Sequence, residues 1–444
     1  MRAQRSLALR TATLFRTCAE TSIAGAAALP AAAAAAATPG VSEAAAEDVI
    51  TPWEVKARGP KGVDYKRVTE TFQAQPVDDT TVAAFSRAFE AVRTRKGSSA
   101  AASDAHHLVR RGCVFAHRDA DAFLDGVAAP DGGRGYLYTG RGPSASAMHI
   151  GHIIPFLFTR HLQQALDLPL VIQITDDEKF LFRGIDAKAM DKMTTANIKD
   201  IIAFGLDREK TFIFRNTKYM GDLYPTVLEV QRLMTGNAVK NTFGFTDVDN
   251  VGKFAFPATQ AAPSFVSSFP RVLPCKSRNV RCLIPCAVHQ DPFFVLTRNI
   301  ADRIKRPKPA LLLTKFMPAL KGAQHKMSSS AEENGTILVT DEEKVIRRKL
   351  KRAFSGGRGT LEQLQEEGAD LDVDVAYQLL VFLCPDDAKV DSIGRDYKSG
   401  VLSSGAVKEA AGDVVSDVLA EFKARRASVT DADVEHFMSV RSIW

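Results

Sequence analysis

The stretch YLYTGRGPSASAMHIGHIIPF, residues 136–156, decides the fold. It begins with an apolar run typical of a strand, breaks at a turn of glycine, proline and serine, and continues with helical spacing. A second apolar run, LPLVIQITDDEK at 168–179, follows that helix and is typical of another strand. Strand, helix and strand at this spacing predict a βαβ unit and therefore an α/β fold with a parallel, Rossmann-like sheet.

Two histidines, His149 and His152, flank Gly151 where this helix begins. In parallel sheets, ligands lie outside the carboxyl ends of the strands, and the free N–H groups of a helix N-terminus favour phosphate there. The imidazoles can donate hydrogen bonds to phosphate oxygens, and Gly151 leaves room for a flat ring against the helix. Taken alone, such a pair is more often a surface or cap feature.

A second motif, GAQHKMSSS at 322–330, follows about 170 residues later. Lys326 can reach a β- or γ-phosphate as a mobile point charge, and the serines add donors. Lysine and serine are common in loops, so this motif is also only suggestive when alone. Its combination with the first motif is far more specific.

Composition limits the class of protein. The 444 residues are 45% hydrophobic and 25% charged, as in soluble globular proteins with two or three domains. A net charge of +6 means that nucleic-acid binding requires clustered charge. Six cysteines in so long a chain indicate reduced thiols rather than a disulfide framework, and no run is apolar enough to predict a membrane span.

The N-terminus differs from the rest. Residues 1–47 are rich in arginine and alanine, with no acid before Glu20, which is typical either of an organelle transit peptide or of a disordered extension. Both interpretations stay open. A helix is predicted over 83–99, ending at Gly97.

The C-terminal part is predicted to be all-helical. A helix over 340–354 begins with a capping box of Thr340 and Glu343, and another covers 406–427 with Gly412 as its weak point.

The motifs together resemble the class I aminoacyl-tRNA synthetases, whose hallmarks are HIGH and KMSKS, and more closely the tryptophanyl-tRNA synthetases of eukaryotic and archaeal type. The resemblance covers about residues 48–444. It rests on YTGRGPS, AMHIGHIIPF, LVIQITDDEK, FGFTD, FPATQAAPSF, CLIPCA, QDPFF, KMSSS, FSGGR and DVDVAY.

The resemblance implies a ligase that activates L-tryptophan with ATP and Mg²⁺, releases pyrophosphate and transfers the amino acid to tRNA(Trp). It implies an N-terminal extension at 48–104 packed on a catalytic domain at 105–340, an anticodon-binding domain at 341–444 and a homodimer. The body resembles the cytoplasmic form, while the first residues leave an organelle open. Two alternatives remain, a tyrosine–tRNA ligase and a non-catalytic synthetase-like binding protein.

The resemblance also implies the roles of single residues. The catalytic residues would be His149, His152, Lys326 and Ser328. ATP would be bound by these four together with Thr139, Gly140, Gly151 and Met327.

The tryptophan pocket follows in the same way. Tyr138 and Gln173 match positions that hold the indole nitrogen, and Glu178, Gln260 and Gln290 match positions that hold the ammonium group. Considered singly, each residue has a commoner explanation: a core role for Tyr138, a satisfied strand amide for Gln173 and a surface charge for Glu178.

One residue departs from the subfamily, which usually has an acid where this chain has His289. We expect His289 to turn outward or to replace the acid as a hydrogen-bond partner; a pH dependence of activation is the alternative. Its spacing from Cys275, Cys282 and Cys286 is irregular, so we predict no metal site.

Positive charge concentrates at the start of the C-terminal region. The cluster suits phosphate contacts to tRNA, although a solvated helix face is the commoner explanation of such a run. Its members are Lys344, Arg347, Arg348, Lys349, Lys351 and Arg352.

Overall fold

A seven-stranded sheet positions the site of this chain. The computed structural model describes residues 48–50, 55–57, 59, 62–98, 104–275, 277–326 and 335–444. The strand order is β3-β4-β9-β8-β5-β6-β7, in which β9, β8, β5, β6 and β7 are parallel and β4 and β3 are antiparallel additions. The strands are β3 Gln75–Pro76, β4 Val114–Arg118, β5 Gly135–Arg141, β6 Leu170–Ile174, β7 Thr211–Arg215, β8 Arg281–Ala287 and β9 Ala310–Thr314. The predicted α/β class with a parallel sheet is confirmed.

The sheet is doubly wound about β5. The chain passes from β5 through β6 to β7, then returns to β8 on the other side of β5, so the strand order reverses between β5 and β8. Loops leaving the carboxyl ends of these two strands diverge to opposite faces, which opens a crevice between them. Tyr138 to Arg141 and Cys286 to Gln290 border that crevice.

Alternation along the strands supplies a separate core on each face. Leu137 packs on one face, whereas its neighbours Tyr136 and Tyr138 pack on the other, as the two-residue period of a strand requires. The first core includes side chains of α3 Asp79–Arg95, α5 Ala120–Ala128, α6 Ile150–Leu166 and α8 Ala187–Ala203. The second includes side chains of α2 Tyr65–Phe72, α9 Asn216–Gln231, α11 Val251–Ala261 and α12 Asp291–Ala301.

A second, small sheet carries the lysine motif. Its order is β1-β2-β11-β10, all antiparallel where paired, so a hairpin from the N-terminal extension continues the hairpin that leads into residues 327–330. The strands are β1 Val49–Ile50, β2 Val55–Lys56, β10 Pro318–Ala319 and β11 Gly322–Lys326. Short helices complete the central region: α4 His107–Arg110, α7 Glu178–Arg183, α10 Gly236–Phe243, η1 Ala262–Ser264, η2 Val266–Ser268, η3 Val288–Gln290 and η4 Asp302–Ile304.

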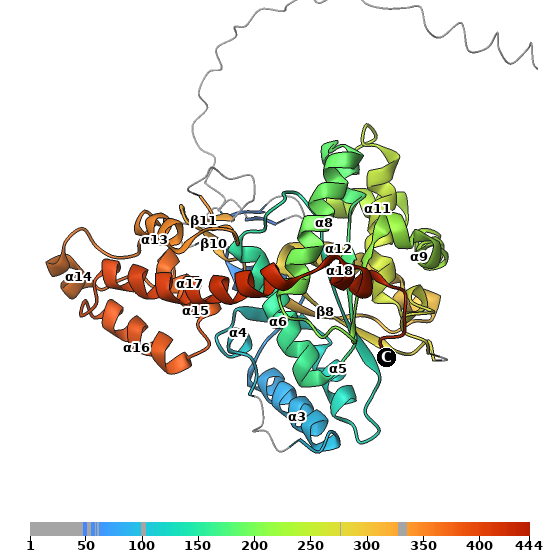
Figure 1. The fold of residues 1–444 in the computed structure, drawn as a ribbon, viewed down its shortest axis with the longest axis horizontal. Coiled ribbons are helices and arrows are strands. Elements are labelled where there is room, and N and C mark those ends of the chain that lie inside the picture. The colour runs from blue at the N-terminus through green and yellow to red at the C-terminus, as the bar shows by residue number, and fades with distance from the viewer. Residues whose placement is uncertain are drawn as a thin grey trace, which may run out of the picture. The chain divides into compact units, whose positions relative to one another are not determined.

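The C-terminal region is helical, as predicted, and its helices α13 to α17 gather together in Figure 1. They are α13 Glu343–Lys351, α14 Leu361–Glu367, α15 Val375–Leu383, α16 Asp387–Lys398, α17 Ser404–Ser428 and α18 Asp431–Met438. Leu350, Leu379 and Leu419 join the same apolar core as Leu137 of the sheet. The helical region is therefore anchored on the sheet by burial of apolar surface. None of the helices in the described ranges combines the length and the apolar run that a membrane span requires.

Two predicted details of these helices have different outcomes. The capping box of Thr340 and Glu343 is wrong, since α13 begins at Glu343 after the N-cap residue Glu342, and no side chain caps it. Gly412 does lie inside α17, where it is buried against α13. A Cβ atom there would stand 3.2 Å from Nη1 of Arg347, so glycine allows the two helices to approach closely.

Three histidines meet where α4 contacts the end of α15. The ring of His106 lies 4.1 Å from that of His107 and 4.7 Å from that of His161, measured between centroids. Arg111 donates hydrogen bonds to the carbonyl oxygens of Val381 and Cys384, which caps the last turn of α15. Burial lowers the pKa of His106 to about 2 and that of His161 to about 4, so both rings are neutral in the folded protein.

This cluster predicts an acid-sensitive fold. Below about pH 6.5 the unfolded chain binds protons at these histidines, whereas the folded chain does not. The free energy of unfolding therefore has its full value above that pH and falls as the pH decreases toward 4. Replacing His161 by leucine removes one such group, worth about 2 kcal/mol between pH 7 and pH 5. The drop in thermal midpoint over that interval should shrink by about 2 °C in the variant, measured by scanning calorimetry. Between pH 7 and pH 8 the two proteins should differ by a constant amount; an unchanged acid response would contradict the assignment.

Candidate active site

A cavity of about 340 Å³ lies at the crevice between β5 and β8. It collects residues from the histidine motif and from the loops after β5, β6, β8 and β9. Of the sequence-predicted site residues, those lining it are Tyr138, Thr139, Gly140, His149, Gly151, His152, Glu178, Gln260 and Gln290. A volume of this size is typical of small-molecule sites.

The histidine motif forms the entry of α6, as the sequence predicts. His149 is the N-cap residue, with extended backbone angles, and Gly151 and His152 lie in the first turn. The imidazole rings of His149 and His152 stack with centroids 3.5 Å apart. Both rings lie on the wall of the cavity, next to the helix N-terminus, where a phosphate is favoured.

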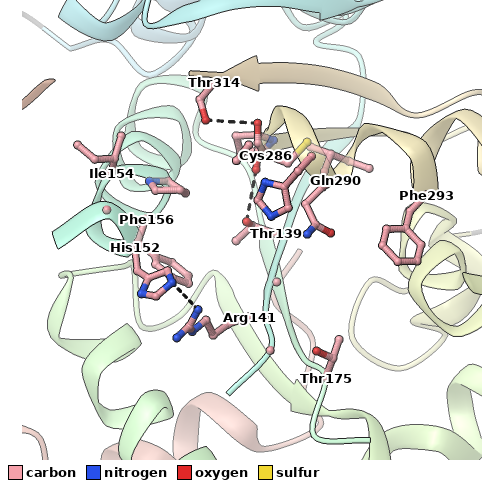
Figure 2. A pocket seen from close by; sticks show the side chains of 18 of the residues that line it. Thr139, Arg141, His152, Ile154, Phe156, Thr175, Cys286, Gln290, Phe293 and Thr314 are labelled. Atoms are coloured by element: carbon pink, nitrogen blue, oxygen red, sulfur yellow. Dashed lines mark hydrogen bonds between the residues drawn. The ribbon is translucent and has the colours of Figure 1, made fainter. Parts of the chain in front are cut away.

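Arg141 is a site residue that the sequence analysis missed, although it lies within the quoted motif YTGRGPS. Its Nη1 atom lies 2.8 Å from Nε2 of His152, a contact drawn in Figure 2, and its Nε donates to Oδ1 of Asn197. Burial lowers the pKa of Arg141 to about 10, so the guanidinium still carries its charge at neutral pH. It adds a fixed positive charge beside the two histidines.

Backbone hydrogen bonds tie the histidine motif to the segment that follows the lysine motif. The amide of Ile150 donates to the carbonyl of Ile337 at 2.9 Å, and the amide of Val339 donates to the carbonyl of Met148 at 2.9 Å. His149 and Leu338 form the antiparallel bridge between them. The entry of α6 is therefore fixed by a segment almost two hundred residues further along the chain.

The lysine motif itself is described only in part. Lys326 ends β11, and the position of its side chain is not among the described features. Met327 and Ser328 lie outside the described residues, as does the N-terminal stretch 1–47. The roles given to Lys326, Met327 and Ser328 stay predictions.

The predicted indole-binding residues form one buried hydrogen-bonded group. The hydroxyl of Tyr138 donates to Oε1 of Gln173 at 2.5 Å and accepts from Nε2 of Gln260 at 2.9 Å. Tyr138 and Gln260 line the cavity, whereas Gln173 lies behind Tyr138 and is fully buried. The sequence predicts Gln173 in the pocket wall, whereas in the structure it contacts the wall through Tyr138.

The predicted ammonium-binding residues lie at two edges of the same cavity. Glu178 starts α7 and pairs with Lys179, whose Nζ lies 2.6 Å from Oε1. Gly142 has no Cβ, and one placed there would lie 2.6 Å from Oε2 of Glu178, so the glycine makes room for the carboxylate. Gln290 ends η3 on the other side of the crevice, and Figure 2 shows it beside Thr139 and Cys286.

The remaining predicted ATP contacts lie on β5. Thr139 donates from Oγ1 to the carbonyl of Pro285 at 3.4 Å, which links β5 to β8. A Cβ atom on Gly140 would stand 3.2 Å from the carbonyl oxygen of Gln173. Glycine at this position thus allows β5 to lie close to β6.

His289 faces the cavity instead of turning outward. It lines the cavity next to Gln290, and its ring centroid lies 5.3 Å from that of Phe316. Cys282 and Cys286 are buried in β8, where burial raises the pKa of both thiols. In the described part of the chain, no three His, Cys, Asp or Glu side chains are grouped so that they could hold a metal ion.

The predicted tRNA-binding cluster divides into two kinds of residue. Arg347 forms ion pairs with Glu343, Glu409 and Asp413, and the buried Lys349 pairs with Asp341 at 2.6 Å. These two cations hold α13 in place. The other four are exposed, and no ion pair with a described residue is found for them: Lys344, Arg348, Lys351 and Arg352. Their spacing puts them on one side of the helix.

Known proteins similar to this chain identify its family. The family model described as tRNA synthetases class I (W and Y) matches residues 132–420. The cytoplasmic tryptophan–tRNA ligase of Homo sapiens is 45% identical over 403 residues, covering 90% of this chain and 82% of that protein. The corresponding ligase of Dictyostelium discoideum is 42% identical over 401 residues, covering 89% and 96%.

Solved structures show the same similarity in three dimensions. The tryptophanyl-tRNA synthetase of Plasmodium falciparum has a TM-score of 0.76 and 38% sequence identity, and the match covers 85% of this chain and 95% of that one. The family model spans more than half of the chain, and these relatives are matched over most of their length. This chain therefore belongs to the class I tRNA synthetases of the tryptophan and tyrosine group, and within that group to the tryptophanyl-tRNA synthetases.

Proposed function

We propose that this chain is a tryptophan–tRNA ligase, which activates L-tryptophan with ATP and then esterifies it to tRNA(Trp). The observation that carries the proposal is a single cavity with two chemically different ends. One end has the stacked His149 and His152 at a helix N-terminus, and the other has the hydrogen-bonded floor made by Tyr138 and Gln260. The first suits phosphates and the second suits a ring with one N–H donor.

The charge of the cavity supports ATP as the cosubstrate. Arg141, Lys179, Arg183 and Lys315 line it, and Glu178 is its one acid within the described residues. Such an excess of positive charge stabilises a triphosphate and the charge that develops during its displacement. With one carboxylate already paired to lysine, Mg²⁺ would enter with ATP and take most of its ligands from phosphate and water.

The chemistry requires positioning more than covalent participation. The tryptophan carboxylate attacks the α-phosphorus in line, the bond to the β-phosphate breaks, and tryptophanyl-adenylate and pyrophosphate result. His149 would donate a hydrogen bond to the phosphates, and Arg141, which donates to Nε2 of His152, would hold that ring against them. Lys326 and Ser328 would lie over the departing pyrophosphate.

Selection of the amino acid would rest on hydrogen bonds, whose geometry is directional. Glu178, Gln260 and Gln290 would accept the three hydrogens of the ammonium group, and Tyr138 with Gln173 would receive the indole N–H. A tyrosine–tRNA ligase is disfavoured because this constellation matches an indole reader. A non-catalytic binding protein is disfavoured because His149, His152 and Lys326 are all present, with His289 the one departure.

The remaining assignments follow from the same family. The helical region from 341 to 444 would bind the anticodon arm, residues 48–104 would support the catalytic domain at 105–340, and the chain would form a homodimer. The pairing of β2 with β11 supports the second assignment. Exposed Tyr224 and Leu228, one turn apart on α9, supply apolar surface of the kind that subunit interfaces use. We infer a cytoplasmic enzyme, with an organelle as the alternative destination.

The direct test is tryptophan-dependent exchange between ATP and labelled pyrophosphate, with tyrosine as the control amino acid. Exchange with tryptophan alone is expected, because the floor of the pocket is built for an indole N–H. Exchange with tyrosine alone would favour the other branch of the group. No exchange with either amino acid would contradict catalysis and direct attention to His289.

Replacing Lys326 by alanine should separate chemistry from amino-acid binding. Exchange is expected to fall by about a hundredfold, the scale of losing one charge-stabilising group. Tryptophan affinity, measured by titration calorimetry, should stay within about twofold, since the lysine acts on phosphate. An equal loss of both would refute the assigned role.

The two kinds of cation on α13 should respond differently to mutation. Replacing Arg348 and Lys351 by alanine should weaken tRNA binding and reduce the slope of log affinity against log salt by about 1.8, because two phosphate contacts are lost. Replacing Arg347 should instead lower the thermal midpoint and leave that slope near its original value. Fluorescence anisotropy between 50 and 200 mM salt measures both effects; a salt-independent affinity would argue against a tRNA-binding role for this helix face.

A further inference from the structure

A chain of four hydrogen bonds connects Asp177 with the floor of the tryptophan pocket. Nδ2 of Asn216 donates to Oδ1 of Asp177 at 2.8 Å, and Nε2 of Gln173 donates to Oδ1 of Asn216 at 2.9 Å. The hydroxyl of Tyr138 then donates to Oε1 of Gln173 at 2.5 Å, and Nε2 of Gln260 donates to that hydroxyl at 2.9 Å. Gln173, Asn216 and Asp177 stand behind the cavity wall, so they act on a ligand through Tyr138.

Asp177, at the far end of this series of hydrogen bonds, sets the donor-to-acceptor direction of the whole series. An ionised carboxylate only accepts hydrogen bonds, so Asp177 requires the NH₂ side of Asn216 to face it. Burial raises the pKa of Asp177 to about 6, which leaves the group mostly ionised at pH 7. The carbonyl oxygen of Asn216 must then point toward Gln173. Asn216 is fully buried at the start of α9, so water does not compete for these bonds.

The orientation of Gln173 follows from that of Asn216. Both hydrogens of its NH₂ group are used, one by Oδ1 of Asn216 and the other by the carbonyl of Thr259 at 3.2 Å. Oε1 therefore faces Tyr138 and takes the hydroxyl proton. The Tyr138 oxygen, which lines the cavity, keeps a lone pair for a donor inside the pocket.

We propose that Asn216 and Asp177 are positioning residues for substrate selection: they fix the hydrogen-bond direction that makes the pocket floor an acceptor for the indole N–H. The inference rests on the proposed function and adds two residues to it that the hallmark motifs do not include. If the amide of Gln173 turned over, its NH₂ group would face the Tyr138 hydroxyl. The Tyr138 oxygen would then accept from that NH₂ group as well as from Nε2 of Gln260, and its proton would turn to the carbonyl of Gln260 at 3.1 Å, so no lone pair would remain for the indole N–H.

The test compares two substrates that differ at one group. In β-(3-benzothienyl)alanine, sulfur replaces the indole N–H while the ring size stays nearly the same. Amino-acid-dependent pyrophosphate exchange gives kcat/KM for tryptophan and for this analogue, in the wild type and in Asn216→Leu. The wild type should prefer tryptophan strongly, because a site built to bind an N–H rejects a ligand without one. The variant should lose at least about tenfold of that preference, with the KM for ATP unchanged.

Two further variants separate positioning from general damage. Gln163→Leu removes another buried amide, which donates to Oγ1 of Thr211 and accepts from the amide of Asp207 on the opposite face of the sheet. It should lower the thermal midpoint and leave the substrate ratio at the wild-type value.

The second variant exchanges the amide and the carboxylate between positions 216 and 177. Asn216→Asp alone puts two carboxylates in contact and should lower both activity and preference. Combined with Asp177→Asn, it restores one donor and one acceptor between the two positions and still offers Gln173 an oxygen. The double variant should therefore recover most of the preference for tryptophan even if Asn216→Leu fails to fold.

The outcomes are distinguishable. An unchanged substrate ratio in folded Asn216→Leu, or a double variant that stays as poor as Asn216→Asp, would overturn the inference. Absence of tryptophan-dependent exchange in the wild type would instead overturn the proposed function. A ratio that collapses in Gln163→Leu as well would show that any buried amide has this effect, and would also refute the specific role of Asn216.

Discussion

The backbone pairing between residues 148–150 and residues 337–339 is the contact on which the active site depends. It joins the entry of α6 to the segment beyond the lysine motif, so a loop of almost two hundred residues must close before the phosphate end of the cavity exists. The cost of closure rises only slowly with loop length, and burial of Ile150, Ile337 and Val339 in the main core offsets it. The position of His149 is thus fixed by a tertiary strand pair, with the helix cap as its local part.

The two ends of the cavity use different interactions, charge at the phosphate end and hydrogen bonding at the amino-acid end. At the phosphate end, several cations line the cavity, and Arg141 keeps its charge despite burial. At the amino-acid end, neutral amides and a phenol satisfy one another almost completely. A buried polar group without a partner costs free energy, so a satisfied network that leaves one acceptor open discriminates strongly between ligands with and without a donor.

Because α13 packs against the other C-terminal helices, the basic residues along it have different roles. Lys349 and Arg347 are committed to contacts with Asp341 and with acids of α17, and the close approach of α13 to α17 depends on Gly412. Only the cations on the exposed side of α13 are available to a partner. The same helix therefore serves two purposes: one side is held by Asp341 and α17, and the exposed side attracts a polyanion.

The sequence by itself determined the class of fold and the strand–turn–helix that carries the histidine motif, because these follow from local periodicity and from residues that are contiguous in the chain. The family resemblance added the roles of nine residues that line the cavity. The sequence analysis missed Arg141, Asn216 and Asp177 as site residues, and it misplaced the start of α13. Those features depend on which side chains meet across the sheet. Asn216 follows β7 and Gln173 lies on β6, and only the parallel register of these strands brings the two amides together. Local sequence determines which groups are present, while their pairing, burial and hydrogen-bond direction are long-range properties that the tertiary structure alone decided.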